Sequence, residues 1–117
     1  MAVERRPVLV VNDEPDIRQA LRNYLVALGH EVLEAGNGLE ALLAVKRHSP
    51  GVVLLDLTMP RLDGFATIKH IQKFDASIRI VVVSGYVDEA AHARLEALGV
   101  AVLGKPLDLA LLDSLVR

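Results

Sequence analysis

Four short runs of consecutive apolar residues constrain the fold of this chain more than any other feature of its sequence. They are rich in valine, isoleucine and leucine, which is typical of strands buried on both faces of a parallel sheet. The runs cover residues 8–11, 52–55, 80–83 and 100–103. Because the segments between them carry helix-like apolar spacing, the pattern of alternating strands and helices predicts an α/β fold with parallel pairing.

A fifth strand is expected at residues 31–35, and it differs from the other four in carrying two acids, Glu31 and Glu34. Acidic side chains are poorly suited to the middle of a sheet, so this strand is placed at an edge. The strand order 2-1-3-4-5 satisfies that placement and puts the switch point between the first and third strands. Open α/β sheets bind ligands at the carboxyl ends of the strands beside this point.

The five helices are predicted from apolar spacing and from the residues that start and stop them. Pro15 suits the first turn of the first helix, and Gly29 suits its end. Asn37, with Glu40 three residues later, fits the cap of the second helix. The predicted helices span residues 14–28, about 37 onward, 64–74, 88–99 and 108 onward.

Four polar residues follow or end the apolar runs, and this placement predicts one functional site. Asp13 follows the first run and Asp56 the second, while Ser84 and Lys105 follow the third and fourth. Since the carboxyl ends of parallel strands meet at one edge of a sheet, these side chains are expected to converge.

The residue types at this edge suit phosphoryl chemistry. Two neighbouring carboxylates repel each other, so Asp13 and Asp56 favour a bound cation. Mg²⁺ is the expected ion because it prefers oxygen ligands and takes only one or two carboxylates. A carboxylate such as Asp56 can also attack phosphorus and form an aspartyl phosphate. The Lys105 ammonium and the Ser84 hydroxyl would then stabilise the phosphoryl oxygens.

Each of these polar residues also has a purely structural interpretation. In that interpretation Asp13 is a helix cap without a metal role, Ser84 is the first residue of a turn, and Lys105 is an ordinary surface lysine. Metal-dependent hydrolysis is a weaker interpretation of the same acids, because no histidine falls at a predicted strand end. The histidines are His30, His48, His70 and His92.

Length, net charge and cysteine content narrow the classes of protein to which the chain can belong. The 117 residues suit one domain, residues 1–117. The net charge of −2 provides no basic surface for direct nucleic-acid binding. The chain has no cysteine, which favours a reducing compartment. Its apolar stretches are too short for a signal sequence or a membrane span, so a cytoplasmic protein without a membrane partner is expected.

These segments together resemble the receiver domain of two-component response regulators over nearly the whole chain. The matching segments are residues 8–15, 54–60, 63–64, 83–85 and 105–106. By this resemblance Asp56 is the phosphoacceptor and Asp13 a direct Mg²⁺ ligand. The backbone carbonyl of Thr58 would complete the protein's metal ligands. Ser84 corresponds to the switch hydroxyl and Lys105 to the lysine that contacts the phosphoryl group.

The resemblance also implies a flavodoxin-like fold and a set of partners. A histidine kinase or phosphotransfer protein would supply the phosphoryl group, and an unknown output domain or protein would read it. The fourth helix, fifth strand and fifth helix would form the face that changes its binding preference. Such a protein helps to catalyse its own modification but is not an enzyme with an independent substrate. It can be free-standing or a part of a longer protein.

Two positions depart from the pattern of that family. Receivers usually carry two acids after the first strand, whereas the first position here is Asn12. Its amide can hold a metal-bound water but adds no charge, so weaker Mg²⁺ binding is expected. Val102 stands where an aromatic residue commonly moves with the switch hydroxyl. These departures leave open a second hypothesis, a receiver-shaped interaction scaffold that works without phosphorylation.

A nucleotide-binding domain is a further alternative from another class. Residues 36–41 fit the glycine pattern of dinucleotide-binding proteins, follow a strand and open a helix. The match follows the edge strand rather than a strand at the switch point. Asn37 and Gly38 are better explained as a helix cap and a tight turn.

Overall fold

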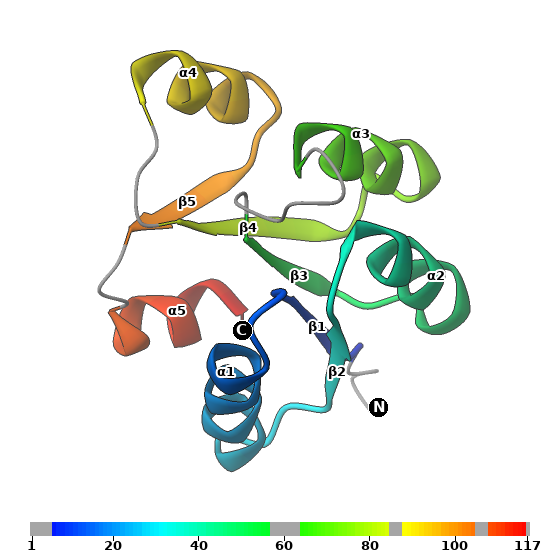
Figure 1. The fold of residues 1–117 in the computed structure, drawn as a ribbon, viewed down its shortest axis with the longest axis vertical. Coiled ribbons are helices and arrows are strands. Elements are labelled where there is room, and N and C mark those ends of the chain that lie inside the picture. Colours follow the sequence, from blue (N-terminus) through cyan, green and yellow to red (C-terminus); the bar gives the residue numbers. More distant parts are fainter. Residues whose placement is uncertain (1–5, 57–63, 85–87, 105–107, 117) are drawn as a thin grey trace, which may run out of the picture.

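The computed structural model describes residues 6–56, 64–84, 88–104 and 108–116. Its centre is a parallel sheet of five strands in the order β2-β1-β3-β4-β5 (Figure 1). The strands are β1 (Val8–Val11), β2 (Val32–Ala35), β3 (Val52–Asp56), β4 (Arg79–Ser84) and β5 (Ala101–Gly104). The predicted strand order, the edge position of β2 and the α/β class are therefore confirmed, and strand boundaries differ from prediction by one residue at most.

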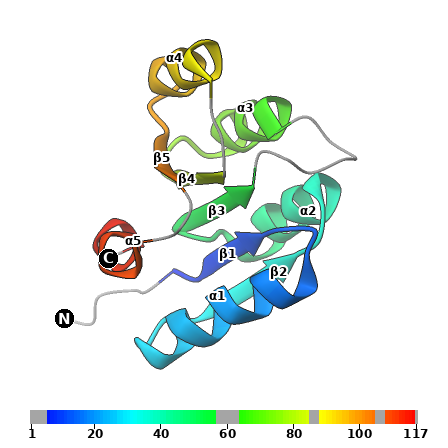
Figure 2. The same ribbon diagram turned by 60° about the vertical axis from the view of Figure 1, so that its left-hand side comes forward.

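Five helices cover the two faces of the sheet (Figures 1 and 2). They are α1 (Pro15–Ala27), α2 (Gly38–His48), α3 (Gly64–Phe74), α4 (Glu89–Ala97) and α5 (Leu109–Val116). One apolar core forms under α2, α3 and α4, and a second forms under α1 and α5. Within the described part of the chain, no helix is both long and apolar enough to cross a bilayer.

The strands supply both cores because successive side chains point to opposite faces. In β1, Leu9 and Val11 pack with α2 and α3, whereas Val8 and Val10 pack with α1 and α5. All four are at most 2% exposed. Fully burying one such side chain stabilises a fold by about 1.5–3 kcal/mol, so the unbroken apolar runs fix β1 and β3 in the middle of the sheet.

Polar side chains fix where the helices begin. Asn37 caps α2, because its side chain accepts a hydrogen bond from the Glu40 amide at 2.9 Å. The predicted Asn37 cap is therefore confirmed. The reciprocal bond of a capping box differs, because the Glu40 carboxylate accepts from the Gly36 amide at 3.0 Å and not from the amide of the cap residue. Asp88 caps α4 by accepting from the Ala91 amide at 2.7 Å.

The amino ends of the strands are held by a cluster of exposed polar groups, here called the Arg6 clasp: Arg6, Ser49, Asp75 and Ser77. Arg6 donates to the Ser49 carbonyl at 2.9 Å, to the Ser77 hydroxyl at 3.1 Å and to the Asp75 carboxylate at 3.2 Å. The Ser77 hydroxyl and amide also donate to Asp75, at 2.6 and 2.9 Å. Hydrogen bonds from Ser77, and then the Arg6 guanidinium, hold the pKa of Asp75 below its usual value.

Candidate functional site

Buried polar side chains gather at the opposite, carboxyl edge of the sheet. Asn12 and Asp56 are each 3% exposed and Ser84 is 1% exposed. Among the described residues only Thr67, within α3, is another polar side chain so deeply buried. Burying a carboxylate or an amide costs free energy unless partners compensate. A concentration of such groups at the strand ends therefore marks this edge as the candidate site.

Strand register brings the ends of β1, β3 and β4 together. Val11 of β1 pairs with Leu55 of β3, so Asn12 and Asp56 follow paired residues at the same level of the sheet. Asp56 pairs with Val83 of β4, and Ser84 follows directly. Since neighbouring strands lie about 4.8 Å apart, the backbone brings the positions of Asn12, Asp56 and Ser84 to one edge of the sheet. Of the four residues predicted to converge, this register places Asp56 and Ser84.

Asp13 lies in the turn between β1 and α1 and is exposed. The N-cap position of α1 belongs to Glu14, whose side chain makes no capping hydrogen bond. The Glu14 amide donates instead to the Asn12 side-chain oxygen at 2.8 Å. Asn12 thus provides the side-chain acceptor that the structural interpretation assigns to Asp13.

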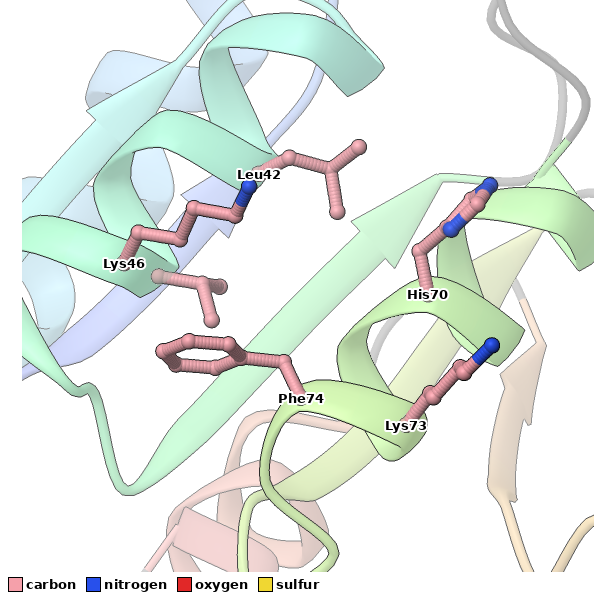
Figure 3. A pocket seen from close by; sticks show the side chains of 6 residues that line it. Leu42, Lys46, His70, Lys73 and Phe74 are labelled. Carbon is pink, nitrogen blue, oxygen red and sulfur yellow. The ribbon is translucent and has the colours of Figure 1, made fainter.

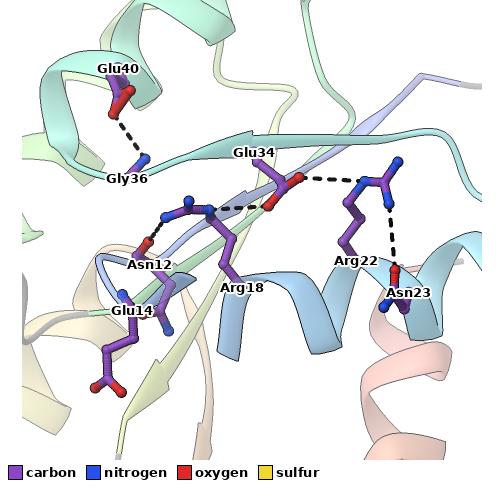
Figure 4. A network of polar contacts seen from close by, with 8 residues as sticks. All are labelled: Asn12, Glu14, Arg18, Arg22, Asn23, Glu34, Gly36 and Glu40. Carbon is purple, nitrogen blue, oxygen red and sulfur yellow. Dashed lines mark hydrogen bonds and ion pairs between the residues drawn. The ribbon is translucent and has the colours of Figure 1, made fainter. Parts of the chain in front are cut away.

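Arg18 of α1 adds a positive charge to this edge that the sequence analysis missed (Figure 4). Its guanidinium donates to the Asn12 carbonyl at 2.7 Å and to Glu34 of β2 at 3.1 Å. Arg22, one turn further along α1, lies 3.4 Å from the other Glu34 oxygen. Glu34 is also one of the two acids from which β2 was predicted to be the edge strand. The edge strand is therefore linked to the site through one arginine.

Nothing in the sequence separates Arg18 from an ordinary solvated arginine on a helix. The one hint that the sequence offers is its position. Arg18 comes one helical turn after the acidic residues that follow β1, and the predicted edge strand carries acids with which a cation could pair. Recognising the contact requires the fold, because Arg18 and Glu34 are joined only once α1 packs beside β2.

The oxygen-rich edge fits a hard divalent cation. Asp56 and Asp13 offer carboxylate oxygens, and the Asn12 side-chain oxygen has a second lone pair besides the one used by Glu14. Mg²⁺ needs only one or two carboxylates when water and phosphate complete its coordination. Thr58 and Lys105 lie outside the described residues, so their expected contributions stay predictions.

The four histidines lie on or next to helices and not at the carboxyl ends of the strands. His48, His70 and His92 are exposed on α2, α3 and α4, as expected. His30, between α1 and β2, lies with its Nε2 3.8 Å from an Asp113 oxygen of α5. The part of the chain that the structure describes contains no group of three or more histidine, cysteine or acidic side chains arranged to hold a metal.

Comparison with known proteins places the whole fold in one family. The sequence pattern of the response regulator receiver domain matches residues 8–117. The chain is 41% identical over 78 residues to the chemotaxis protein CheY of Bacillus subtilis, covering 66% of this chain and 65% of CheY. It is 31% identical over 103 residues to the sporulation initiation phosphotransferase F of the same organism, covering 87% and 83% of the two chains.

Solved structures agree with this assignment. A response regulator receiver protein from Pseudomonas putida superposes with a TM-score of 0.91 at 35% identity, covering 98% of each chain. CheY of Borrelia burgdorferi, in a complex with CheX, BeF3 and Mg²⁺, superposes with a TM-score of 0.86 at 29% identity over 95% of this chain and 86% of that one. Some curated relatives are far longer: the chain spans 34% of a probable transcriptional regulator from Pyropia yezoensis.

Proposed function

Because the chain belongs to the response regulator receiver domain family of two-component signalling, we propose that Asp56 accepts a phosphoryl group from a histidine kinase or phosphotransfer protein. Receivers are signalling proteins rather than enzymes with a separate substrate. The observation that supports the proposal most strongly is the burial of Asp56, which is 3% exposed. It ends the central strand β3, between the end of β1, which Asn12 follows, and the end of β4 at Ser84.

The proposed reaction is a direct phosphoryl transfer. A side-chain oxygen of Asp56 attacks the phosphorus of a phosphohistidine, a P–O bond forms and the P–N bond breaks. The leaving imidazole nitrogen keeps the bonding electron pair and takes a proton from water. Positioning and charge stabilisation supply most of the rate in such transfers. Ser84, directly after the β4 residue that pairs with Asp56, is suited to donate its hydroxyl to a phosphoryl oxygen.

Mg²⁺ is the proposed cofactor, held by Asp13 and Asp56, by the carbonyl of Thr58 and, through water, by Asn12. When bound, it would neutralise negative charge on the phosphoryl oxygens. The Borrelia CheY complex that contains Mg²⁺ and BeF3 supports this choice. Lys105, after the Gly104 that pairs with Ser84, is proposed to supply the second positive charge.

The proposed output is a change at α4, β5 and α5, read by an output domain or protein. The helix α4 buries one side chain, Leu95, which suits an element that shifts at low cost. Contacts with α3 include the Arg94 guanidinium, 3.8 Å from the centre of the Phe65 ring, and a hydrogen bond at 2.7 Å from Gln72 to the carbonyl of Leu98, which follows α4.

The absence of cysteine from the sequence supports a cytoplasmic location.

The test is incubation with acetyl phosphate, with and without Mg²⁺, followed by intact-mass measurement. The proposal predicts a gain of one phosphoryl group that needs Mg²⁺ and is lost in Asp56→Asn. A Ser49→Ala variant, changed at an exposed residue on the opposite edge, should gain the same mass. Unchanged mass in the wild-type protein would refute phosphorylation at this site.

A receiver-shaped scaffold that works without phosphate is the second candidate. The observation that favours it is Asn12, which stands where most receivers carry an acid and whose oxygen already accepts the Glu14 amide. Under this alternative, binding to the output partner would be the same before and after acetyl phosphate treatment. A change in that affinity would exclude it.

A further inference from the structure

A groove of about 220 Å³ opens between α2 and α3, away from the carboxyl edge (Figure 3). Figure 3 shows Leu42 and Lys46 of α2 and Phe74 of α3 reaching into the space between the helices, with His70 and Lys73 at its α3 side. The lining residues are Leu42, Val45, Lys46, His70, Lys73 and Phe74. Half of the lining side chains are apolar, and the other half are two lysines and a histidine.

The charge of this surface is opposite to that of the whole chain. The two helices carry four cationic side chains, Lys46, Arg47, Lys69 and Lys73, against one acid, Glu40, in a chain of net charge −2. Glu40 is at the far end of α2 and is already bonded to the Gly36 amide. Within the described ranges, neither lysine of the groove forms an ion pair or a hydrogen bond. Their charges are therefore available to an acidic partner.

Three of the five exposed large apolar side chains in the described part of the chain lie on these two helices, and the other two, Val26 and Leu111, lie on α1 and α5. Phe74 at the groove is 50% exposed, and Leu39 and Leu43 on α2 are 66% and 46% exposed. A volume of about 220 Å³ is below the roughly 300–1,000 Å³ of pockets that enclose drug-sized ligands. It suits one large apolar side chain, which is how anchor residues fill pockets at protein interfaces.

We propose that the α2–α3 groove binds an acidic segment of a partner protein. One aromatic or branched apolar side chain of that segment would fill the groove against Val45 and Phe74. Flanking carboxylates would pair with Lys46 and Lys73. A second copy of this chain is a poor occupant, because a groove-to-groove contact would bring together two surfaces on which cationic side chains outnumber acids four to one. The surface is separate from Asp56, so the proposal goes beyond phosphoryl transfer.

A fluorescein-labelled octapeptide, with one central phenylalanine flanked by aspartates and glutamates, provides the first test by fluorescence anisotropy. The proposal predicts saturable binding that weakens roughly tenfold when alanine replaces the phenylalanine or when amides replace the acids. Amide chemical shifts in NMR spectra should change mainly in α2 and α3. Absence of peptide binding, or shifts confined to other helices, would overturn the proposal.

Charge reversal provides the second test. In a Lys46→Glu, Lys73→Glu double variant two exposed attractions become repulsions, so affinity for the peptide should fall roughly tenfold. Lys69→Glu is the matched control, since Lys69 is exposed on α3 but does not line the groove, and it should bind within about twofold of wild type. Equal losses in both variants would show nonspecific attraction and overturn the proposal.

Three further measurements separate this site from phosphorylation and exclude a second copy of the chain or a membrane surface as the occupant. Asp56→Asn should bind the peptide as tightly as wild type. Sedimentation should show that the unbound protein does not self-associate through the groove, and phosphatidylglycerol vesicles should bind no better to wild type than to the double variant. Self-association or vesicle binding that depends on Lys46 and Lys73 would replace the peptide as the occupant and overturn the proposal.

Discussion

Polar side chains lie at both ends of the parallel strands, but those at the amino ends are exposed and those at the carboxyl ends are buried. At the amino ends, the Arg6 clasp joins exposed groups, with Arg6 and Asp75 side chains 34% and 31% exposed. At the carboxyl ends, Asn12, Asp56 and Ser84 are almost fully buried. Exposed hydrogen bonds add modest stability, whereas a buried carboxylate carries a desolvation cost. The amino edge therefore stabilises the fold, whereas the carboxyl edge retains buried polar groups that the proposed phosphoryl transfer would use.

The largest effect is expected at Asp56. Asp56→Asn should abolish phosphoryl uptake, because an amide cannot act as the nucleophile. The free energy of unfolding should stay the same or rise, since the substitution removes a buried charge. Intact mass after acetyl phosphate treatment and urea unfolding measure the two properties. A clear loss of stability would show that Asp56 is mainly structural and would break the comparison.

A change at the opposite edge should have the reverse effect. Arg6→Ala removes three exposed hydrogen bonds that tie Arg6 to Ser49, Ser77 and Asp75. The free energy of unfolding should fall by about 1 kcal/mol, with the rate of phosphoryl uptake within about twofold of wild type. Lys69→Ala, at an exposed residue outside the clasp, is the control for urea unfolding. A strong effect of Arg6→Ala on uptake would mean that the two edges are coupled.

Asn12 allows a finer test within the carboxyl edge. Asn12→Asp should bind Mg²⁺ several-fold more tightly, because it adds a carboxylate to a site that already has Asp13 and Asp56. An aspartate can still accept the Glu14 amide, so the start of α1 should be preserved. Asn12→Ala is the contrasting variant and should lose about 1 kcal/mol of stability. Equal Mg²⁺ affinity in wild type and Asn12→Asp, measured by calorimetry, would contradict this account of the site.

The smallest effect concerns pH and Asp75. Its pKa lies below the usual 3.8 because of the Ser77 hydrogen bonds and Arg6. The fold therefore binds its proton less readily than the unfolded chain, so the contribution of Asp75 is complete above the unfolded pKa and is lost as pH falls through the folded pKa. Asp75→Asn should flatten the dependence of Tm on pH below about 4. Identical slopes in variant and wild type would exclude this role.

The sequence predicts the fold closely because burial on both faces leaves a strong pattern. The apolar runs of β1, β3 and β4 and the acids of β2 indicate which strands are central and place β2 at an edge, in agreement with the observed strand order. The site is predicted only in part. Asp56 and Ser84 end central strands, which a linear pattern can show, and Asn12 was singled out as a departure from the family. Its hydrogen bond to Glu14 and the approach of Arg18 depend on side-chain directions and helix packing that spacing does not encode.

The identity of the phosphorylated residue tests the central claim most directly. After treatment with acetyl phosphate and Mg²⁺, borohydride reduction and peptide mass spectrometry locate an aspartyl phosphate along the chain. The account predicts modification at Asp56 alone, the buried carboxylate at the end of β3. Modification at Asp13, or at an exposed acid such as Asp88 with Asp56 unmodified, would contradict it.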